Sequence, residues 1–192
     1  MSLTLRKELA DIKEASVKLS ANYSKIILPA RQQALTDAQD QFSLFFKEQG
    51  FDINKNPNGL QAKYKGSEIT LTNTDPKEQF LGADVNLTIT DNPGNKTYEI
   101  RMIRVRATTT SAHFGEIRST SSEAEKLAYQ IAREKETFEQ LQKNHDEALK
   151  GVTFKFTYAE TTVKYHRMGD PKPPSHDKYF DSMNALLQAI FN

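Results

Sequence analysis

The feature that most constrains the fold is a heptad-like seam near the start of the chain. Its members are separated by alternating steps of four and three: Leu5, Leu9, Ile12, Ser16, Leu19, Tyr23, Ile26 and Ala30. Such spacing aligns the side chains along one side of a helix and indicates packing against another helix. A compact sheet cannot cover a seam sustained over more than three heptads, so we expect a second long helix.

A proline interrupts this first helical pattern. Pro29 removes a backbone donor and disfavours helix at the preceding residue, so it either kinks one long helix or starts a second. The pattern resumes over 31–49, and Gly50 is placed to form a left-handed C-cap with Phe51 packed on Phe46. The sequence therefore predicts one bent helix or two helices over 4–49.

A second long helix is predicted over 121–150. Its start is marked by a capping box, either Ser122 with Glu125 or Thr120 with Glu123. Two polar residues, Glu134 and His145, also occupy positions of its seam. Because the two helices share length and spacing, we predict that they pair antiparallel as a stalk. The predicted helix-interface residues are Leu5, Leu9, Ile12, Leu19, Ile26, Leu127, Ile131, Phe138 and Leu141.

The remaining segments alternate apolar and polar residues with a period of two, which is typical of strands. Residues 60–71 predict a hairpin, residues 85–89 and 97–107 a further strand pair, and residues 152–158 another strand. The apolar parity of the 97–107 strand flips between Met102 and Ile103. Such a flip predicts a bulge or a change of packing partner.

Together these elements predict a single α+β domain over 1–192. We expect an antiparallel sheet of five to six strands, with a C-terminal helix over 179–191 on one face. The stalk of long antiparallel helices comprises 4–49 and 121–150, and the body comprises 51–107 plus 152–191.

Composition excludes several classes of function. The absence of cysteine excludes disulfide scaffolds, zinc–cysteine sites, iron–sulfur clusters and thiol catalysis. Twenty-six Lys and Arg against twenty-five Asp and Glu give a net charge of +1, too little for a general attraction to nucleic acid or membranes. No apolar run reaches the roughly 18 residues of a membrane span. We expect no cofactor, no membrane association and a cytoplasmic location, because the first residues lack an apolar signal region.

Few motifs suggest catalysis or metal binding. Residues 52–63 begin like a calcium loop, but Pro57 and Lys63 stand where that loop needs Gly and a bidentate Glu. No nucleophile elbow or glycine-rich phosphate loop is present. Two histidines and two aspartates fall within a proline-rich connector, and they leave a metal site or an enzyme as an alternative. These residues are His166, Asp170, His176 and Asp177. We expect a protein without enzymatic activity.

A basic strand over 96–106 favours nucleic-acid binding as an alternative function. Arg104 and Arg106 share one parity with Tyr98, which could stack on a base. The candidate contacts are Arg101, Arg104, Arg106 and Arg118. Arginines that alternate along a strand also protect a sheet edge against pairing, which is a purely structural role.

The preferred hypothesis is a non-enzymatic interaction or assembly protein whose helical stalk binds itself or a protein partner. Small residues on the helix flanks admit close approach by further helices: Ala10, Ala15, Ala21, Ala128 and Ala132. This composition suits a four-helix arrangement made by two chains, and the two-fold dimer is the commonest closed assembly. A monomer with an ordinary two-helix hairpin is the alternative.

Overall fold

The computed structural model describes residues 3–57, 59–73, 85–92, 94–106, 122–162 and 178–192. The chain divides into two compact units. The first comprises Met1–Ala30 with Arg106–Val152, and the second comprises Arg31–Val105 with Thr153–Asn192.

Helix α1, Leu3–Glu48, is one continuous helix that contributes residues to both units. Pro29 lies inside it, so the alternative of two separate helices is wrong. The helix ends as the sequence predicts, because Gly50 adopts the left-handed region with φ of 85°. The backbone N–H of Phe51 donates to the carbonyl of Phe46 at 2.9 Å, and the centroids of their rings are 5.4 Å apart.

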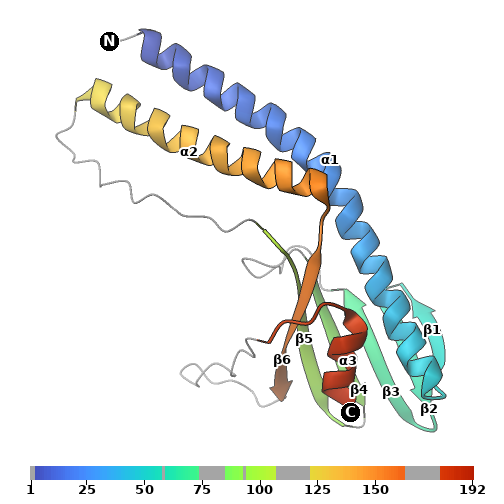
Figure 1. The fold of residues 1–192 in the computed structure, drawn as a ribbon. Coiled ribbons are helices and arrows are strands. Elements are labelled where there is room, and N and C mark those ends of the chain that lie inside the picture. The colour runs from blue at the N-terminus through green and yellow to red at the C-terminus, as the bar shows by residue number, and fades with distance from the viewer. Residues whose placement is uncertain (1–2, 58, 74–84, 93, 107–121, 163–177) are drawn as a thin grey trace. The chain divides into compact units, whose positions relative to one another are not determined.

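The second unit contains an antiparallel sheet of six strands in sequential order (Figure 1). The strands are β1 Asp52–Asn56, β2 Gly59–Tyr64, β3 Ser67–Asn73, β4 Val85–Asn92, β5 Lys96–Arg104 and β6 Phe154–Thr162. The α+β class and the predicted antiparallel sheet are therefore confirmed. Each strand pairs with the next one along the chain, including β5 with β6, although α2 lies between these two strands in sequence.

One face of the sheet carries the hydrophobic core. The C-terminal part of α1 and the short helix α3, Met183–Phe191, both lie on this face (Figure 1). The backbone N–H of Asn184 donates to the side-chain oxygen of Gln41 at 2.9 Å, which ties α3 to α1. The largest fully buried side chains are Phe42, Leu71, Leu87, Ile89, Ile100, Met102, Met183, Leu186 and Leu187. Burial of each contributes roughly 1.5–3 kcal/mol.

Two segments of the sheet had ambiguous sequence patterns. The calcium-like segment forms β1, in which Ile53 pairs with Ala62 of β2, so these residues do not make the loop that calcium requires. Of the two explanations for the change of parity at 102–103, a bulge is absent from the pairing of β5 with β6, which runs unbroken to Arg104. Among the described residues, the pairing of β5 with β4 extends as far as Met102, which pairs with Val85.

In the first unit, α2 spans Glu123–Lys150 and begins with the predicted capping box. The backbone N–H of Ser122 donates to Glu125 Oε2 at 2.6 Å, and the N–H of Glu125 donates to Ser122 Oγ at 3.3 Å. Ser122 is therefore the N-cap, and the alternative start at Thr120 is wrong.

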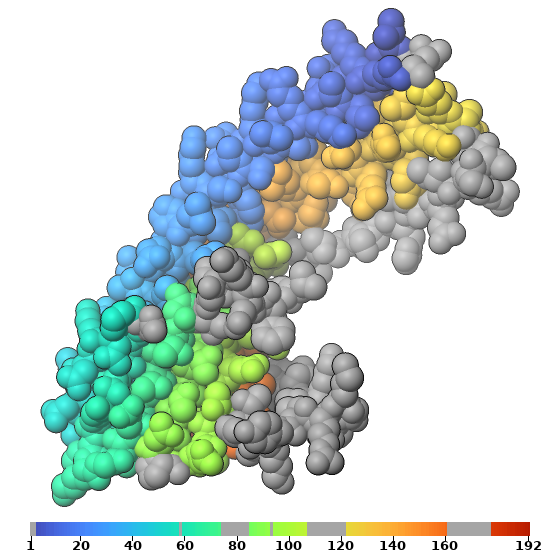
Figure 2. Space-filling model, turned by 180° about the vertical axis from the view of Figure 1, so that it is seen from behind, coloured from blue at the N-terminus to red at the C-terminus, as the bar shows by residue number. Residues whose placement is uncertain are grey.

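The two long helices pack side by side but run parallel (Figures 1 and 2). Arg6, near the start of α1, contacts Glu123 at the start of α2, with 3.1 Å between Nη2 and Oε1. The predicted antiparallel direction is therefore wrong. An antiparallel pair follows from a short connection, whereas residues 49–122, including five strands, separate these helices.

Candidate interaction surface

The direction and register of the helix pair follow from two ion pairs. Besides Arg6 with Glu123, Glu8 Oε1 lies 2.6 Å from Lys135 Nζ. If the two seams are numbered as heptads, both ion pairs join an e position of one helix to a g position of the other. These are the positions that pair across a parallel two-helix seam. Exposed ion pairs contribute only about 0.2–1 kcal/mol each, so their main effect here is to fix register.

In this register Leu5 of α1 lies level with Leu127 of α2, and the following residues of the two helices correspond at the same offset. By this numbering, the apolar positions that stand level with each other are Leu5 with Leu127, Leu9 with Ile131, Leu19 with Leu141 and Ile26 with Ala148. The mixed layers are Ile12 with Glu134, Ser16 with Phe138 and Tyr23 with His145. All nine predicted helix-interface residues therefore lie at seam positions, where Ile131 is buried and the others are half-buried.

The layer that contains Ser16 leaves one polar group without a hydrogen bond. The Ser16 hydroxyl is buried and has no hydrogen-bond partner. Beside it, a groove of about 290 Å³ lies between the helices. Its lining residues are Asp11, Ile12, Ala15, Lys135, Phe138 and Glu139. Three of these side chains are apolar and three are charged, and they offer no arrangement that would orient a ligand.

A second line of residues follows the side of α1 that faces away from the α2 seam. We call it the outer seam, and its members again alternate by four and three: Leu3, Lys7, Ala10, Glu14, Val17, Ala21, Ser24 and Leu28. All are exposed, including Leu3 at 80%, Val17 at 69% and Leu28 at 59%. Sequence reasoning identified only two of its alanines. The seven-residue spacing of positions 3, 10 and 17 could have revealed the rest.

The basic strand does not form one continuous basic face. Tyr98 is 4% exposed and packs in the core against the rings of Tyr158 and Phe191, so its predicted role as a stacking aromatic is wrong. By strand alternation, Arg101 lies on the opposite face of β5 from Arg104. Arg106 follows the strand and is exposed, and the remaining candidate, Arg118, lies outside the described residues.

Ion pairing also offsets positive charge at the start of β5. Lys96 Nζ lies 3.4 Å from Glu160 Oε1 on β6. The phenolate that Tyr98 forms only at high pH and the carboxylate of Glu160 raise the pKa of Lys96, while burial raises the pKa of the Tyr98 hydroxyl. Both groups are therefore in their ordinary neutral-pH forms, a cation and a neutral phenol, and neither is tuned for acid–base catalysis.

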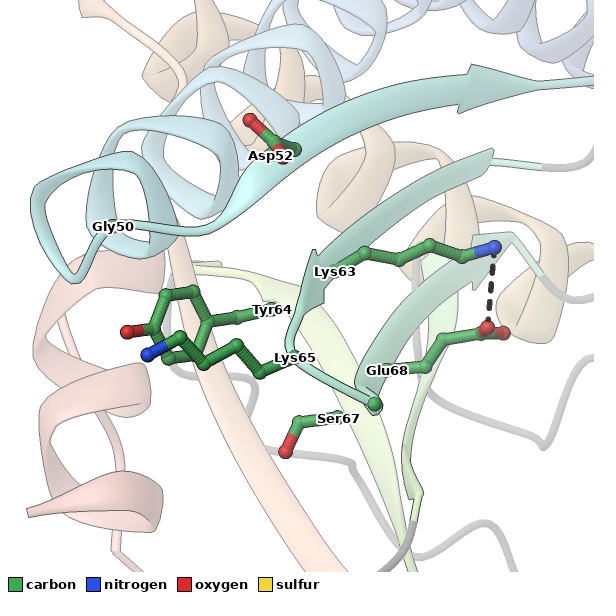
Figure 3. Close-up of a pocket in the computed structure, with 8 residues that line it drawn as sticks. Gly50, Asp52, Lys63, Tyr64, Lys65, Ser67 and Glu68 are labelled. Carbon is green, nitrogen blue, oxygen red and sulfur yellow. Dashed lines mark ion pairs between the residues drawn. The ribbon is translucent and has the colours of Figure 1, made fainter.

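A groove of about 510 Å³ lies at the hairpin that joins β2 and β3. Figure 3 shows the residues that line it. Tyr64 and Lys65 lie together on one side of it, with Lys65 Nζ 5.2 Å from the centre of the Tyr64 ring. Lys63 and Glu68 extend in the other direction and form an ion pair at 3.4 Å. The groove is open, and Lys63 and Glu68 neutralise each other, so it does not suggest a binding site.

The described residues offer no metal centre. Among them, no group of three His, Asp or Glu side chains is placed to hold a metal ion. The predicted grouping of His166, Asp170, His176 and Asp177 lies outside the described residues. His145 is described, and its Nδ1 lies 3.5 Å from Asp146 Oδ1. Of the helices in the described part of the chain, none is long and apolar enough to span a bilayer.

Comparisons with protein families, curated proteins and solved structures find no match for this chain. The helix pair and its exposed outer seam are therefore the features that bear on function.

Proposed function

We propose that this chain is a non-enzymatic interaction or assembly protein that binds itself or a protein partner through its long helices. The observation that carries the proposal is the double seam of α1. One seam faces α2, and the outer seam remains exposed with Leu3, Val17 and Leu28 on its surface.

Periodicity distinguishes the outer seam from ordinary surface residues. Single exposed apolar side chains are common and need no explanation. Here apolar and small residues recur at helical spacing from Leu3 to Leu28, a length of about 37 Å at 1.5 Å per residue. A helix from a partner can lie along such a line and bury its side chains, each large one contributing roughly 1.5–3 kcal/mol.

A photo-cross-linking experiment in the expressing cell tests the proposal. Benzoylphenylalanine replaces Val17 on the outer seam in one variant and Tyr64 in a matched control, where an exposed aromatic residue already stands. We expect ultraviolet light to give one discrete protein adduct at position 17 and none at position 64. The proposal is contradicted if both variants remain at the 21.8 kDa of the free chain.

A further inference from the structure

We propose that the outer seam binds the outer seam of a second copy of this chain, with the two α1 helices antiparallel about a two-fold axis. The axis passes between residues 15 and 16. This inference rests on the proposed function and adds to it the identity of the partner and the register of the contact.

The outer seam is nearly palindromic about that axis. In this register, residues that lie opposite each other have numbers that add to about 31. The layers are Leu3 with Leu28, Lys7 with Ser24, Ala10 with Ala21 and Glu14 with Val17, and symmetry repeats each one. Leucines therefore meet at both ends and alanines meet between them. A two-fold interface requires such self-complementarity, because the same surface serves both subunits.

Charges on the flank of the seam complement each other in the same register. Asp11 and Lys18 are both exposed, and antiparallel packing brings Asp11 of one copy beside Lys18 of the other. Symmetry makes this contact twice. Asp11 forms no ion pair with any described residue, whereas Lys18 Nζ lies 2.6 Å from Glu14 Oε1 of its own helix. Lys18 would then lie between two carboxylates, which also accommodates Glu14 near the centre of the seam.

A parallel arrangement of the two outer seams lacks this complementarity. In register, it would place Lys7 against Lys7 of the second copy and Glu14 against Glu14. Like charges that face each other across an interface disfavour association. The other flank of the antiparallel register pairs Lys13 with Ser20, so it adds no repulsion. Charge therefore selects the antiparallel direction.

Engineered cysteines test the register directly, because the chain has none of its own. One chain carries Ala10→Cys, and a second chain of different tag length carries Ala21→Cys. Mild oxidation should give mainly the mixed disulfide. Two Ala10 positions would lie about 16 Å apart along the antiparallel helices, given 1.5 Å per residue. A disulfide needs Cα atoms within roughly 7 Å, so the Ala10→Cys homodimer should be scarce.

Charge exchange provides a second test in the full chain. Asp11→Lys and Lys18→Asp should each weaken self-association, measured by sedimentation equilibrium, by at least about tenfold, because each creates two like-charge contacts. The double variant should restore association to within about threefold of wild type, since the pair is only reversed. Asp40→Lys is the matched control on an exposed position far along α1, and it should have no effect.

The outcomes separate this inference from the proposed function. A monomeric chain whose position 17 cross-links to a different protein overturns the second-copy proposal while the proposed function stands. A dimer that forms the Ala10→Cys homodisulfide overturns the antiparallel register. So does a dimer whose self-association neither charge variant weakens. If the chain is monomeric and position 17 gives no adduct, both proposals fail.

Discussion

The buried hydroxyl of Ser16 leads to a quantitative prediction about the helix pair. We expect Ser16→Ala to stabilise the protein, because the Ser16 Oγ is buried without a hydrogen-bond partner. Leaving such a group unsatisfied costs about 1–3 kcal/mol. Alanine also gains roughly 0.5 kcal/mol in helix propensity over serine. The predicted increase in the free energy of unfolding is therefore about 1.5–3.5 kcal/mol.

Other hydroxyls of the long helices show what Ser16 lacks. Ser43 Oγ donates to the carbonyl of Gln39 at 3.0 Å, and Thr137 Oγ1 donates to that of Arg133 at the same distance. These four-residue back-bonds are the usual way for a helical hydroxyl to find a partner. Removing such a bonded hydroxyl should yield little or no stabilisation.

The assay is urea unfolding followed by circular dichroism at 222 nm, with Ser20→Ala as the control. Ser20 is exposed on the same helix, so its substitution gains helix propensity without relieving a buried group. The difference between the two variants isolates the cost of the buried hydroxyl. If Ser16→Ala is no more stable than Ser20→Ala, the seam is not desolvated at this layer and the reasoning is refuted.

Three further predictions concern the hairpin, a strand and the start of α2. Lys65 has φ of 42°, and Lys65→Asn should raise the unfolding free energy by about 1 kcal/mol, because asparagine suits the left-handed loop of such hairpins; equal or lower stability in urea would contradict this. Gly59→Ala should cost at least about 3 kcal/mol in the same assay, because an added Cβ would overlap the carbonyl oxygen of Leu71 in β3. The capping-box hydrogen bonds lower the pKa of Glu125, so their stabilisation is present at neutral pH and is lost as the pH falls through that lowered pKa. We therefore expect any excess of the wild-type thermal midpoint over that of Glu125→Gln to disappear between pH 7 and pH 3. An excess that grows as the pH falls would contradict this prediction.

The sequence predicted the elements whose periodicity is strong. The seams of both long helices were visible because Leu and Ile recur at heptad spacing, as from Leu5 to Ile26. The direction of the helix pair was not visible in the sequence, because the spacing along one helix is the same whichever way its partner runs. Direction depends on the charges that flank the seam, here Glu8 and Lys135, and on the long path between the helices.

Weaker patterns hid other features. Strand β1 has only Ile53 directed to the core among polar neighbours, so it resembled a turn. The parity of β5 showed that Tyr98 and Arg104 share a face, but it could not show that this face is covered by helices. The outer seam was hidden because Lys7 and Glu14 interrupt its apolar residues. Only the seven-residue spacing of positions 3, 10 and 17 indicates it in the sequence.

The molecular mass of the purified chain in solution tests the central claim most directly. Sedimentation equilibrium at about 100 µM should give a dimer of twice 21.8 kDa for wild type and for Tyr64→Asp. Val17→Asp should give the monomer with unchanged helix content, because this exposed position contributes to the outer seam and not to the core. A mass of 21.8 kDa for wild type at that concentration would contradict the claim that the outer seam joins two copies.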